Sequence, residues 1–416
     1  MFKTAQRMEK LSPRRWDNKQ DMALGIYISV PFCRTKCSYC NFASDVFSRA
    51  LFERYVDCVC ANIENARQTA ADMGAELEHE VDSVYLGGGT PTMLAAAQLE
   101  RIFAAVRSRF DVKANAEITV ECAPGTLTNA MVESLLHCGM NRVSLGVQSF
   151  VDQEAAAVGR LHKRTTVLED VARLRAMGIS NINIDLIAGL PHQTSESWEC
   201  SLAEVIATGA PHASVYMLEV DEDSRLGREL LAGGARYHAH FVPDEEATAD
   251  FYVAACERFQ SSRITQYEIS NFAREGFESA HNLKYWTRQP YLGFGVDAHS
   301  MLISTIPEID ALRFARADSL DKYVCGAAPQ LTAVSHRAAF EESFFLGLRL
   351  NRGVSLLKIA ARFGDAAADH ARDVVAELLE DGLMEQREDL VWLTSRGRLL
   401  SNEVFQRFIL PEEVLR

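Results

Sequence analysis

The chain has 416 residues, of which 48% are hydrophobic, so it can bury a large core in one large domain and a smaller one. The formal net charge is −14, which argues against a general nucleic-acid partner, because the phosphates of such a partner would be repelled. No apolar stretch approaches the ~18 residues of a membrane-spanning helix, so we expect no membrane span.

Residues 1–24 are predicted to form a polar N-terminal tail. In this tail Arg14 and Arg15 are followed by Trp16 rather than by an apolar segment, so the pattern of a secretory signal is missing. The ten cysteines are an ordinary fraction of the chain, and the trio within residues 33–40 is typical of metal binding in a cytosolic enzyme. We therefore predict a cytoplasmic protein.

Six short apolar runs rich in β-branched residues alternate with helical patterns. The runs are residues 25–30, 83–86, 117–121, 142–147, 181–187 and 214–220. Apolar residues recur at helical spacing in the stretches 96–110, 130–138, 167–177 and 197–208. This alternation predicts an α/β fold with parallel strands, which we expect to form an incomplete (β/α)6 barrel over residues 25–302. The chemistry of such barrels lies at the C-terminal ends of the strands.

Three cysteines directly follow the first predicted strand. Cys33, Cys37 and Cys40 have the spacing Cys-x3-Cys-x2-Cys, which can bring three thiolates to one centre. Three thiolates can hold three irons of a cubane [4Fe–4S] cluster, and Phe42 supplies no fourth thiolate for the open iron. An open iron can chelate S-adenosylmethionine (SAM), whose S–C5′ bond is then broken homolytically by a reducing electron. The alternative is a zinc knuckle, which usually has a second cysteine pair downstream, and the sequence has none.

Further polar residues stand where other predicted strands end. Residues 87–91 read Gly-Gly-Gly-Thr-Pro, and glycines let a ligand approach the backbone closely. Glu121, Gln148 and Asp185 stand at three more strand ends, with Arg160 available as a charge partner. A single such residue is more often a helix cap, but three at equivalent places predict a converging polar site.

Residues 303–335 mix charged and irregular apolar residues, and we predict that they link the barrel to a small domain over residues 336–416. Helical patterns at 338–350, 355–363 and 368–381 precede a hairpin over 383–393 and a helix over 396–408. This order predicts a winged-helix-like α+β domain. From Leu331 to the end, 11 basic and 14 acidic residues do not suit the binding of phosphates, so we expect a lid or docking surface rather than a DNA-binding module.

Several motifs, taken together, resemble one family. They are Tyr27-x3-Pro31-Phe32-Cys33-x3-Cys37-x-Tyr39-Cys40-x-Phe42, residues 87–92, 146–150, 185–191 and 267–272, and His281-Asn282-x2-Tyr285-Trp286. This combination strongly resembles radical SAM proteins of the oxygen-independent coproporphyrinogen III oxidase family, from about residue 25 to the C-terminus. The oxidases carry a fourth cysteine where Phe42 stands here, and an N-terminal extension that this chain lacks. The heme-chaperone branch of the family is therefore the nearer resemblance.

The resemblance also implies roles for single residues. It implies SAM contacts from Tyr27, Tyr39, Gly89, Thr90, Glu121, Gln148, Arg160 and Asp185. No catalytic residue is assigned beyond the cluster. We expect His281 to be the axial heme ligand, because neutral imidazole binds heme iron and two aromatic residues follow in the motif. His299 is the second choice, and the alternative for His281 is a hydrogen-bonded core residue.

These inferences predict a heme chaperone that binds the cluster, SAM and heme and passes heme to heme-requiring proteins, with a separate electron donor. The first alternative is an oxygen-independent coproporphyrinogen III oxidase of porphyrin biosynthesis. A radical SAM methyltransferase with the same cluster is a more distant one. We expect SAM cleavage but no oxidase activity, because Phe42 replaces the extra cysteine.

Overall fold

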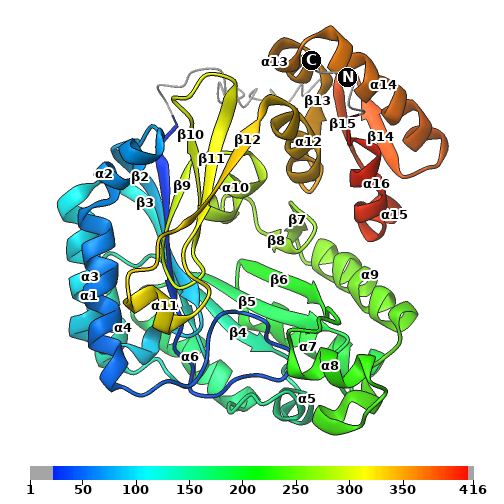
Figure 1. The fold of residues 1–416 in the computed structure, drawn as a ribbon. Helices are drawn as coiled ribbons and strands as arrows, with labels where there is room; N and C mark the ends of the chain where they lie inside the picture. Colours follow the sequence, from blue (N-terminus) through cyan, green and yellow to red (C-terminus); the bar gives the residue numbers. More distant parts are fainter. Residues whose placement is uncertain (1–21, 411–416) are drawn as a thin grey trace, which may run out of the picture.

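The fold is organised around one large open sheet (Figure 1). The computed structural model describes residues 22–410, so nearly all of the predicted N-terminal tail lies outside the described residues. The sheet has twelve strands in the order β12-β11-β10-β9-β1-β2-β3-β4-β5-β6-β8-β7. Its six central strands are parallel: β1 (Leu24–Val30), β2 (Glu80–Gly88), β3 (Asp111–Cys122), β4 (Arg142–Gln148), β5 (Asn181–Ala188) and β6 (His212–Met217). Since β1 and β6 pair outward with other strands, the barrel stays open, and the predicted incomplete (β/α)6 barrel is confirmed.

Helices connect the parallel strands and lie on the outer side of the curved sheet (Figure 1). They are α1 (Ala50–Glu64), α2 (Ala66–Met73), α3 (Ala96–Arg109), α4 (Asn129–His137), α5 (Asp152–Ala157), α6 (Arg164–Ala176) and α7 (Ser195–Thr208). In α3 the buried residues are Leu99, Ile102, Phe103 and Val106, which is the spacing of a single helix face. Strand β1 is buried at every position except Tyr27, as expected for a strand covered on both faces.

After β6 the chain forms smaller elements that bring distant segments back to the barrel. These are α8 (Arg225–Leu231), the 3-10 segment η3 (Arg236–Phe241), α9 (Glu245–Ser261), β7 (Thr265–Gln266), β8 (Asn271–Ala273) and α10 (Ala280–Trp286). Strand β9 (Tyr291–Gly295) then returns parallel to β1 on its free side. Among residues 22–410, no helix is both long and apolar enough to cross a membrane.

The segment predicted as a linker is regular sheet. Strands β10 (His299–Ile303), β11 (Ile309–Ala315) and β12 (Gln330–Ser335) extend the large sheet antiparallel beyond β9, with α11 (Leu320–Val324) between the last two. The predicted linker over 303–335 thus contains two strands and a short helix, and the domain boundary at residue 336 stays a prediction. In β11 the buried Leu312 and Phe314 flank Arg313, whose charge is paired only in the folded structure, so the strand did not stand out as an apolar run.

The C-terminal domain has its own core. It comprises α12 (His336–Gly347), β13 (Val354–Ser355), α13 (Leu356–Phe363), α14 (Asp365–Glu380), β14 (Met384–Arg387), β15 (Leu390–Leu393), α15 (Ser395–Leu399) and α16 (Ser401–Arg407). The helix expected over 396–408 is divided at Leu400, which has φ −105° and ψ 26°. Beyond the break, the ring of Phe408 stacks on that of Phe344 at 4.1 Å, which ties the last helix to α12.

Charged contacts join this domain to the sheet. Glu342 of α12 pairs with Arg288 at 3.0 Å and with Arg313 of β11 at 2.9 Å. Arg349, after α12, lies 3.6 Å from the fully buried Glu268. The contacts orient α12 beside β11, at the end of the sheet where β1 begins and away from the edge that carries the cysteine loop (Figure 1).

Candidate radical SAM site

The three cysteines lie on the loop after β1, at the C-terminal edge of the parallel strands. The loop is held at both ends by the backbone. The Cys33 N–H donates to the Asp45 carbonyl at 3.0 Å, and the Ser38 N–H donates to the Val158 carbonyl at 3.1 Å. These bonds anchor a segment that has no helix or strand of its own, so its thiols keep a defined place above β1.

The sulfur atoms have different surroundings. The Arg160 Nη1 donates to the Cys37 Sγ at 3.6 Å, while the other Nη of the same guanidinium donates to the Gly146 carbonyl. The Cys40 Sγ lies 4.0 Å from the Ser44 hydroxyl. Burial raises the pKa of the Cys33 thiol, which bonds from Ser44 and Thr90 partly oppose. One of the three sulfur atoms thus has a cation fixed beside it by the barrel wall.

The glycine-rich turn after β2 packs directly on this loop. The Gly89 N–H donates to the Val30 carbonyl at 2.7 Å, and the Thr90 N–H donates to the Phe32 carbonyl at 2.8 Å. A Cβ at Gly89 would lie 2.8 Å from both carbonyl oxygens and 3.0 Å from the Cys33 Sγ. Only glycine therefore lets the second strand end approach the cysteine loop this closely.

The donor set fits a cubane better than a single ion. Within residues 22–410, no three His, Cys, Asp or Glu side chains gather as the ligands of one metal ion do. A cubane does not require such a gathering, because each of its three thiolates binds a different iron. All ten cysteines are free thiols, so Cys33, Cys37 and Cys40 form no disulfide.

Two partly buried carboxylates lie inside the barrel. Glu121 accepts from the Tyr85 hydroxyl at 2.8 Å and from the Gly88 N–H at 3.1 Å. Burial, together with the nearby Asp185, raises the pKa of Glu121 to about 7. Asp185 accepts from the Ser144 hydroxyl at 3.0 Å and from the Asn183 amide at 2.7 Å, and burial raises its pKa as well. Each carboxylate keeps acceptor capacity for a ligand's hydroxyl or ammonium group.

The remaining predicted SAM contacts fall in two places. Gln148, which has φ 69°, and Arg160 flank Gly146, at which a Cβ would lie 3.2 Å from both side chains. Tyr39 packs against Val158, Ile187 and Leu190. These side chains lie beside the cysteine loop at the ends of β4 and β5, as the sequence predicted, and their contact with SAM stays a prediction.

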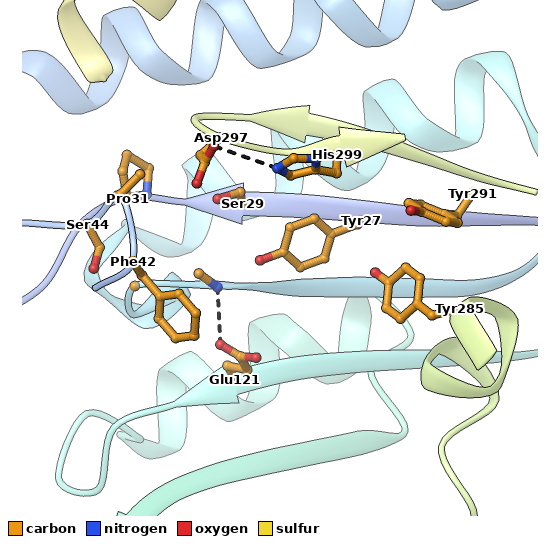
Figure 2. Close-up of a pocket in the computed structure, with 13 residues that line it drawn as sticks. Tyr27, Ser29, Pro31, Phe42, Ser44, Glu121, Tyr285, Tyr291, Asp297 and His299 are labelled. Atoms are coloured by element: carbon orange, nitrogen blue, oxygen red, sulfur yellow. Dashed lines mark hydrogen bonds and ion pairs between the residues drawn. The ribbon is translucent and has the colours of Figure 1, made fainter. Parts of the chain in front are cut away.

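A cavity of about 310 Å³ opens beside the loop (Figure 2). Four of the predicted residues or their neighbours line it: Tyr27, Gly88, Gly89 and Glu121. Phe42 and Ser44 of the cysteine loop lie at one end, and Tyr285 and Tyr291 at the other (Figure 2). Tyr39, Thr90, Gln148, Arg160 and Asp185 do not line this cavity.

Sequence reasoning missed five lining residues, namely Ser29, Ala43, Ser44, Tyr291 and Asp297. The pairing of β9 with β1 brings Tyr291 and Asp297 to the site, and that pairing had no local signal in the sequence. The φ of 56° at Asp297, in a turn between β9 and β10, is the structural mark of the position.

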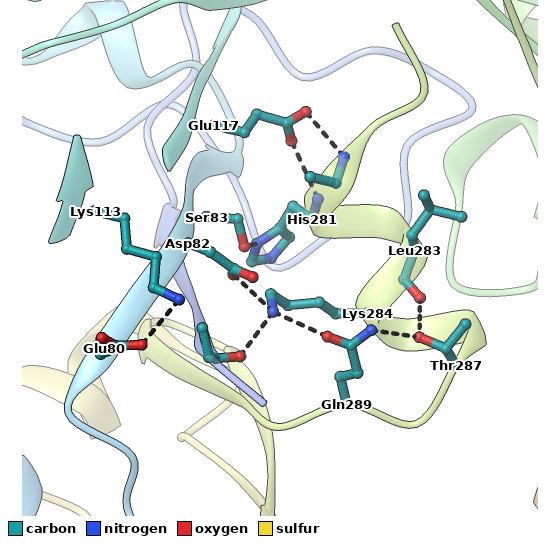
Figure 3. Close-up of polar contacts among 12 residues, drawn as sticks. Glu80, Asp82, Ser83, Lys113, Glu117, His281, Leu283, Lys284, Thr287 and Gln289 are labelled. Carbon is teal, nitrogen blue, oxygen red and sulfur yellow. Dashed lines mark hydrogen bonds and ion pairs between the residues drawn. The ribbon is translucent and has the colours of Figure 1, made fainter. Parts of the chain in front are cut away.

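His281, the expected heme ligand, is buried beside Ser83 (Figure 3), and both of its ring nitrogens have a hydrogen-bond partner. Its Nδ1 lies 3.0 Å from the Ser83 hydroxyl and its Nε2 lies 2.8 Å from the Tyr285 hydroxyl. Burial, with Lys284 as the next cause, lowers the pKa of His281 to about 3, so the ring is neutral. In this conformation an iron bond would require one of the two contacts to break, and the expected ligand role stays a prediction. The structure matches the alternative of a hydrogen-bonded core histidine.

These features define a radical SAM protein: an open parallel barrel with a Cys-x3-Cys-x2-Cys loop after its first strand and a glycine-rich turn after its second. The model of the Radical SAM superfamily matches residues 27–203, and that of the HemN C-terminal domain matches residues 334–400. The solved structure of coproporphyrinogen III oxidase (HemN) from Escherichia coli has the same fold, with a TM-score of 0.77 and 24% identity over 93% of this chain and 90% of that one.

Proteins of similar sequence show which family of radical SAM proteins the chain belongs to. The heme chaperone HemW of Bacillus subtilis (strain 168) is 33% identical over 390 residues, which cover 92% of this chain and 98% of that protein. The heme chaperone HemW of Escherichia coli (strain K12) is 28% identical over 93% of this chain and 98% of its own length. The chain belongs to the HemW family of radical SAM proteins. The predicted family is thereby confirmed.

Proposed function

We propose that this protein is a heme chaperone, which binds heme beside a radical SAM site and passes it to heme-requiring proteins. The observation that carries the proposal is the similarity to proteins named heme chaperone HemW, which extends over both domains and not over the barrel alone. The lack of a fourth thiol at Phe42, which is 65% exposed beside the cavity, supports the same choice over the oxidase.

In this proposal Cys33, Cys37 and Cys40 hold a [4Fe–4S] cluster, and Glu121 and Asp185 face SAM. The cluster, when present and reduced, supplies the electron for homolytic cleavage of SAM. The chain's own residues shape that site: Gly89 makes room next to the Cys33 sulfur, and Arg160 places its positive charge beside Cys37. Glu121 lines the cavity beside the cysteine loop, so its carboxylate is accessible to a ligand there.

The cellular setting follows from the same chemistry. A cluster held by three thiolates needs a reducing compartment and an electron donor, so we propose a cytoplasmic location and a redox partner protein. Heme-requiring proteins are the proposed acceptors.

The alternative function is that of an oxygen-independent coproporphyrinogen III oxidase. The observation in its favour is the likeness of the whole fold to that enzyme, with a TM-score of 0.77. An oxidase must remove carboxyl groups from two propionates of its substrate, which a chaperone does not do.

One anaerobic experiment separates the two functions. The reconstituted protein is incubated with reductant and SAM, and then either with heme or with coproporphyrinogen III. We expect saturable heme binding, heme transfer to an apo-acceptor such as an apo-cytochrome, and no protoporphyrinogen IX while SAM cleavage is demonstrable. Stoichiometric protoporphyrinogen IX without heme transfer would establish the oxidase instead.

A further inference from the structure

A row of buried polar side chains crosses the inside of the barrel beneath the candidate SAM site. The strand register places Ser144 of β4, Asn183 of β5 and His212 of β6 next to one another. His212 is fully buried, and Ser144 and Asn183 are nearly so. Asp185 follows Asn183 on the same strand, closer to the edge that carries the cysteine loop. The row is therefore the layer directly beneath the Asp185 carboxylate.

The Asp185 carboxylate is held by bonds from this row. The Asn183 Nδ2 donates to the Asp185 Oδ1 at 2.7 Å, and the Ser144 hydroxyl donates to the Oδ2 at 3.0 Å. Each carboxylate oxygen thus has one fixed donor and keeps a lone pair for a ligand. The direction of the Asn183 amide is decisive for this arrangement, because a reversed amide would point its oxygen at the carboxylate.

His212 fixes the direction of the Asn183 amide. Its Nδ1 lies 2.6 Å from the Asn183 Oδ1, and its Nε2 lies 3.0 Å from the Tyr267 hydroxyl. The Tyr267 oxygen also accepts from the Ser279 N–H at 3.3 Å, so its own proton can be donated to the Nε2. Burial, with Arg142 as the next cause, lowers the pKa of His212 well below its ordinary value, so the ring is neutral. A neutral imidazole has one N–H, which here is on Nδ1 and is donated to Asn183.

The other neighbours of the amide show why His212 is needed. The Ser214 hydroxyl lies 3.0 Å from the Asn183 Nδ2 and 3.2 Å from its Oδ1, and a hydroxyl can bond to either atom. Ser214 therefore does not determine the direction of the amide. Tyr267 comes from beyond the six parallel strands, because it follows β7, which pairs with β8, and β8 pairs with β6 (Figure 1). The extension of the sheet thus sets the tautomer of His212.

We propose that His212 is a positioning residue of the radical SAM site. Its Nδ1–H fixes the Asn183 amide, and the amide presents Asp185 to SAM as a hydrogen-bond acceptor. Tyr267 takes part by holding the His212 ring in one tautomer. The inference rests on the proposed contact between Asp185 and SAM, and it adds a residue that acts on this contact from beneath.

The test compares the affinity of reconstituted full-length variants for SAM by anaerobic calorimetry. His212→Phe keeps a ring but has no N–H, so we expect a roughly tenfold loss of affinity. His212→Asn can place an amide N–H where the Nδ1–H lies, and its affinity should stay within about threefold of wild type. Tyr267→Phe releases the tautomer and should lose a few-fold. The matched control is Tyr252→Phe, which removes a buried hydroxyl that donates to the Ile269 carbonyl at 2.6 Å, and it should bind SAM like wild type.

Two further measurements separate positioning from a folding defect. In Asp185→Asn protein, the additional change His212→Phe should not lower the SAM affinity further, because its effect passes through that carboxylate. In full-length protein labelled with 15N-histidine, the nitrogen shifts of His212 should show a neutral ring protonated at Nδ1, with no titration between about pH 5 and pH 8. Comparison with His212→Asn identifies the signals of this ring.

The outcomes distinguish the positioning role from the SAM contact on which it rests. A loss of affinity in Asp185→Asn with none in His212→Phe, or equal losses in His212→Asn and His212→Phe, would overturn the positioning role while the SAM contact stands. A ring protonated at Nε2 in wild type would do the same, even if His212→Phe does not fold. An unchanged affinity in Asp185→Asn would instead overturn the contact between Asp185 and SAM.

Discussion

The guanidinium of Arg160 lies 3.6 Å from the sulfur of Cys37, although 123 residues separate them in the chain. The side chain cannot leave easily, because its other Nη donates to the Gly146 carbonyl inside the barrel. A partly buried cation held at one cysteine acts on any charge that the three thiolates carry, since charges there are screened less than in water. The contact therefore couples the barrel wall to the redox chemistry of the loop.

The first prediction concerns that contact. Replacing Arg160 by Gln should shift the reduction potential of the reconstituted cluster to a more negative value, because the reduced cluster carries one more negative charge and loses its nearby cation. Arg160→Lys should retain most of the wild-type potential. The potential is measured by an EPR-monitored redox titration, with iron content as the control for cluster loading. A shift to a more positive value would contradict this account.

The second prediction is the cluster itself. Anaerobic reconstitution should yield about four irons and four sulfides per chain. Cys37→Ala should lose the charge-transfer absorption. Cys58→Ala should keep it, since that thiol lies on α1, where its Sγ is 3.9 Å from the Val324 carbonyl. Full iron content in Cys37→Ala would show that Cys37 is not a cluster ligand and would contradict the proposed cluster site.

The third prediction links SAM binding to pH through Glu121. Because the pKa of this carboxyl is raised to about 7, the group is mostly protonated below that pH and ionised above it. A SAM ammonium or hydroxyl group binds best to the ionised form, so wild-type affinity should rise between about pH 6 and pH 8. Glu121→Gln should bind SAM more weakly by about 1.5–3 kcal/mol at high pH and lose this rise. Anaerobic calorimetry measures the SAM affinity of wild type and of Glu121→Gln at each pH. A wild-type affinity that does not change with pH would show that Glu121 does not contact SAM.

The fourth prediction concerns Gly89. An alanine there would press on two backbone carbonyls that belong to β1 and its loop, and those cannot turn aside as a side chain can. Overpacking of this kind costs about 1–3 kcal/mol, so we expect a lower Tm and reduced iron content. Gly347→Ala is the matched control, because its Cβ would lie 2.7 Å from Val354 in the C-terminal domain. Both variants should have a lower Tm, but only Gly89→Ala should lose iron. Equal iron content in the two variants would show that the glycine-rich turn after β2 is not part of the cluster site.

Local patterns in the sequence were sufficient to predict the parallel barrel and the radical SAM class of the protein. The six parallel strands alternate with amphipathic helices, and both kinds of element follow from residue spacing within short windows. The loop of Cys33, Cys37 and Cys40 is equally local, since all three thiols stand within eight residues of each other after one strand. Glu121, Gln148 and Asp185 could be chosen because parallel strands share one functional edge.

Only the tertiary structure decided what depends on pairing between distant segments. Strand β9 joins β1 from the far side of the barrel, and this places Tyr291, Asp297 and His299 at the cavity. Strand β11 has no clear apolar pattern in the sequence, because it carries Arg313, whose charge pairs with Glu342 of α12 in the folded structure. The burial of His281 and its bond to Ser83 have the same origin, because they come from the packing of α10 on β2, and no single stretch of sequence contains both elements.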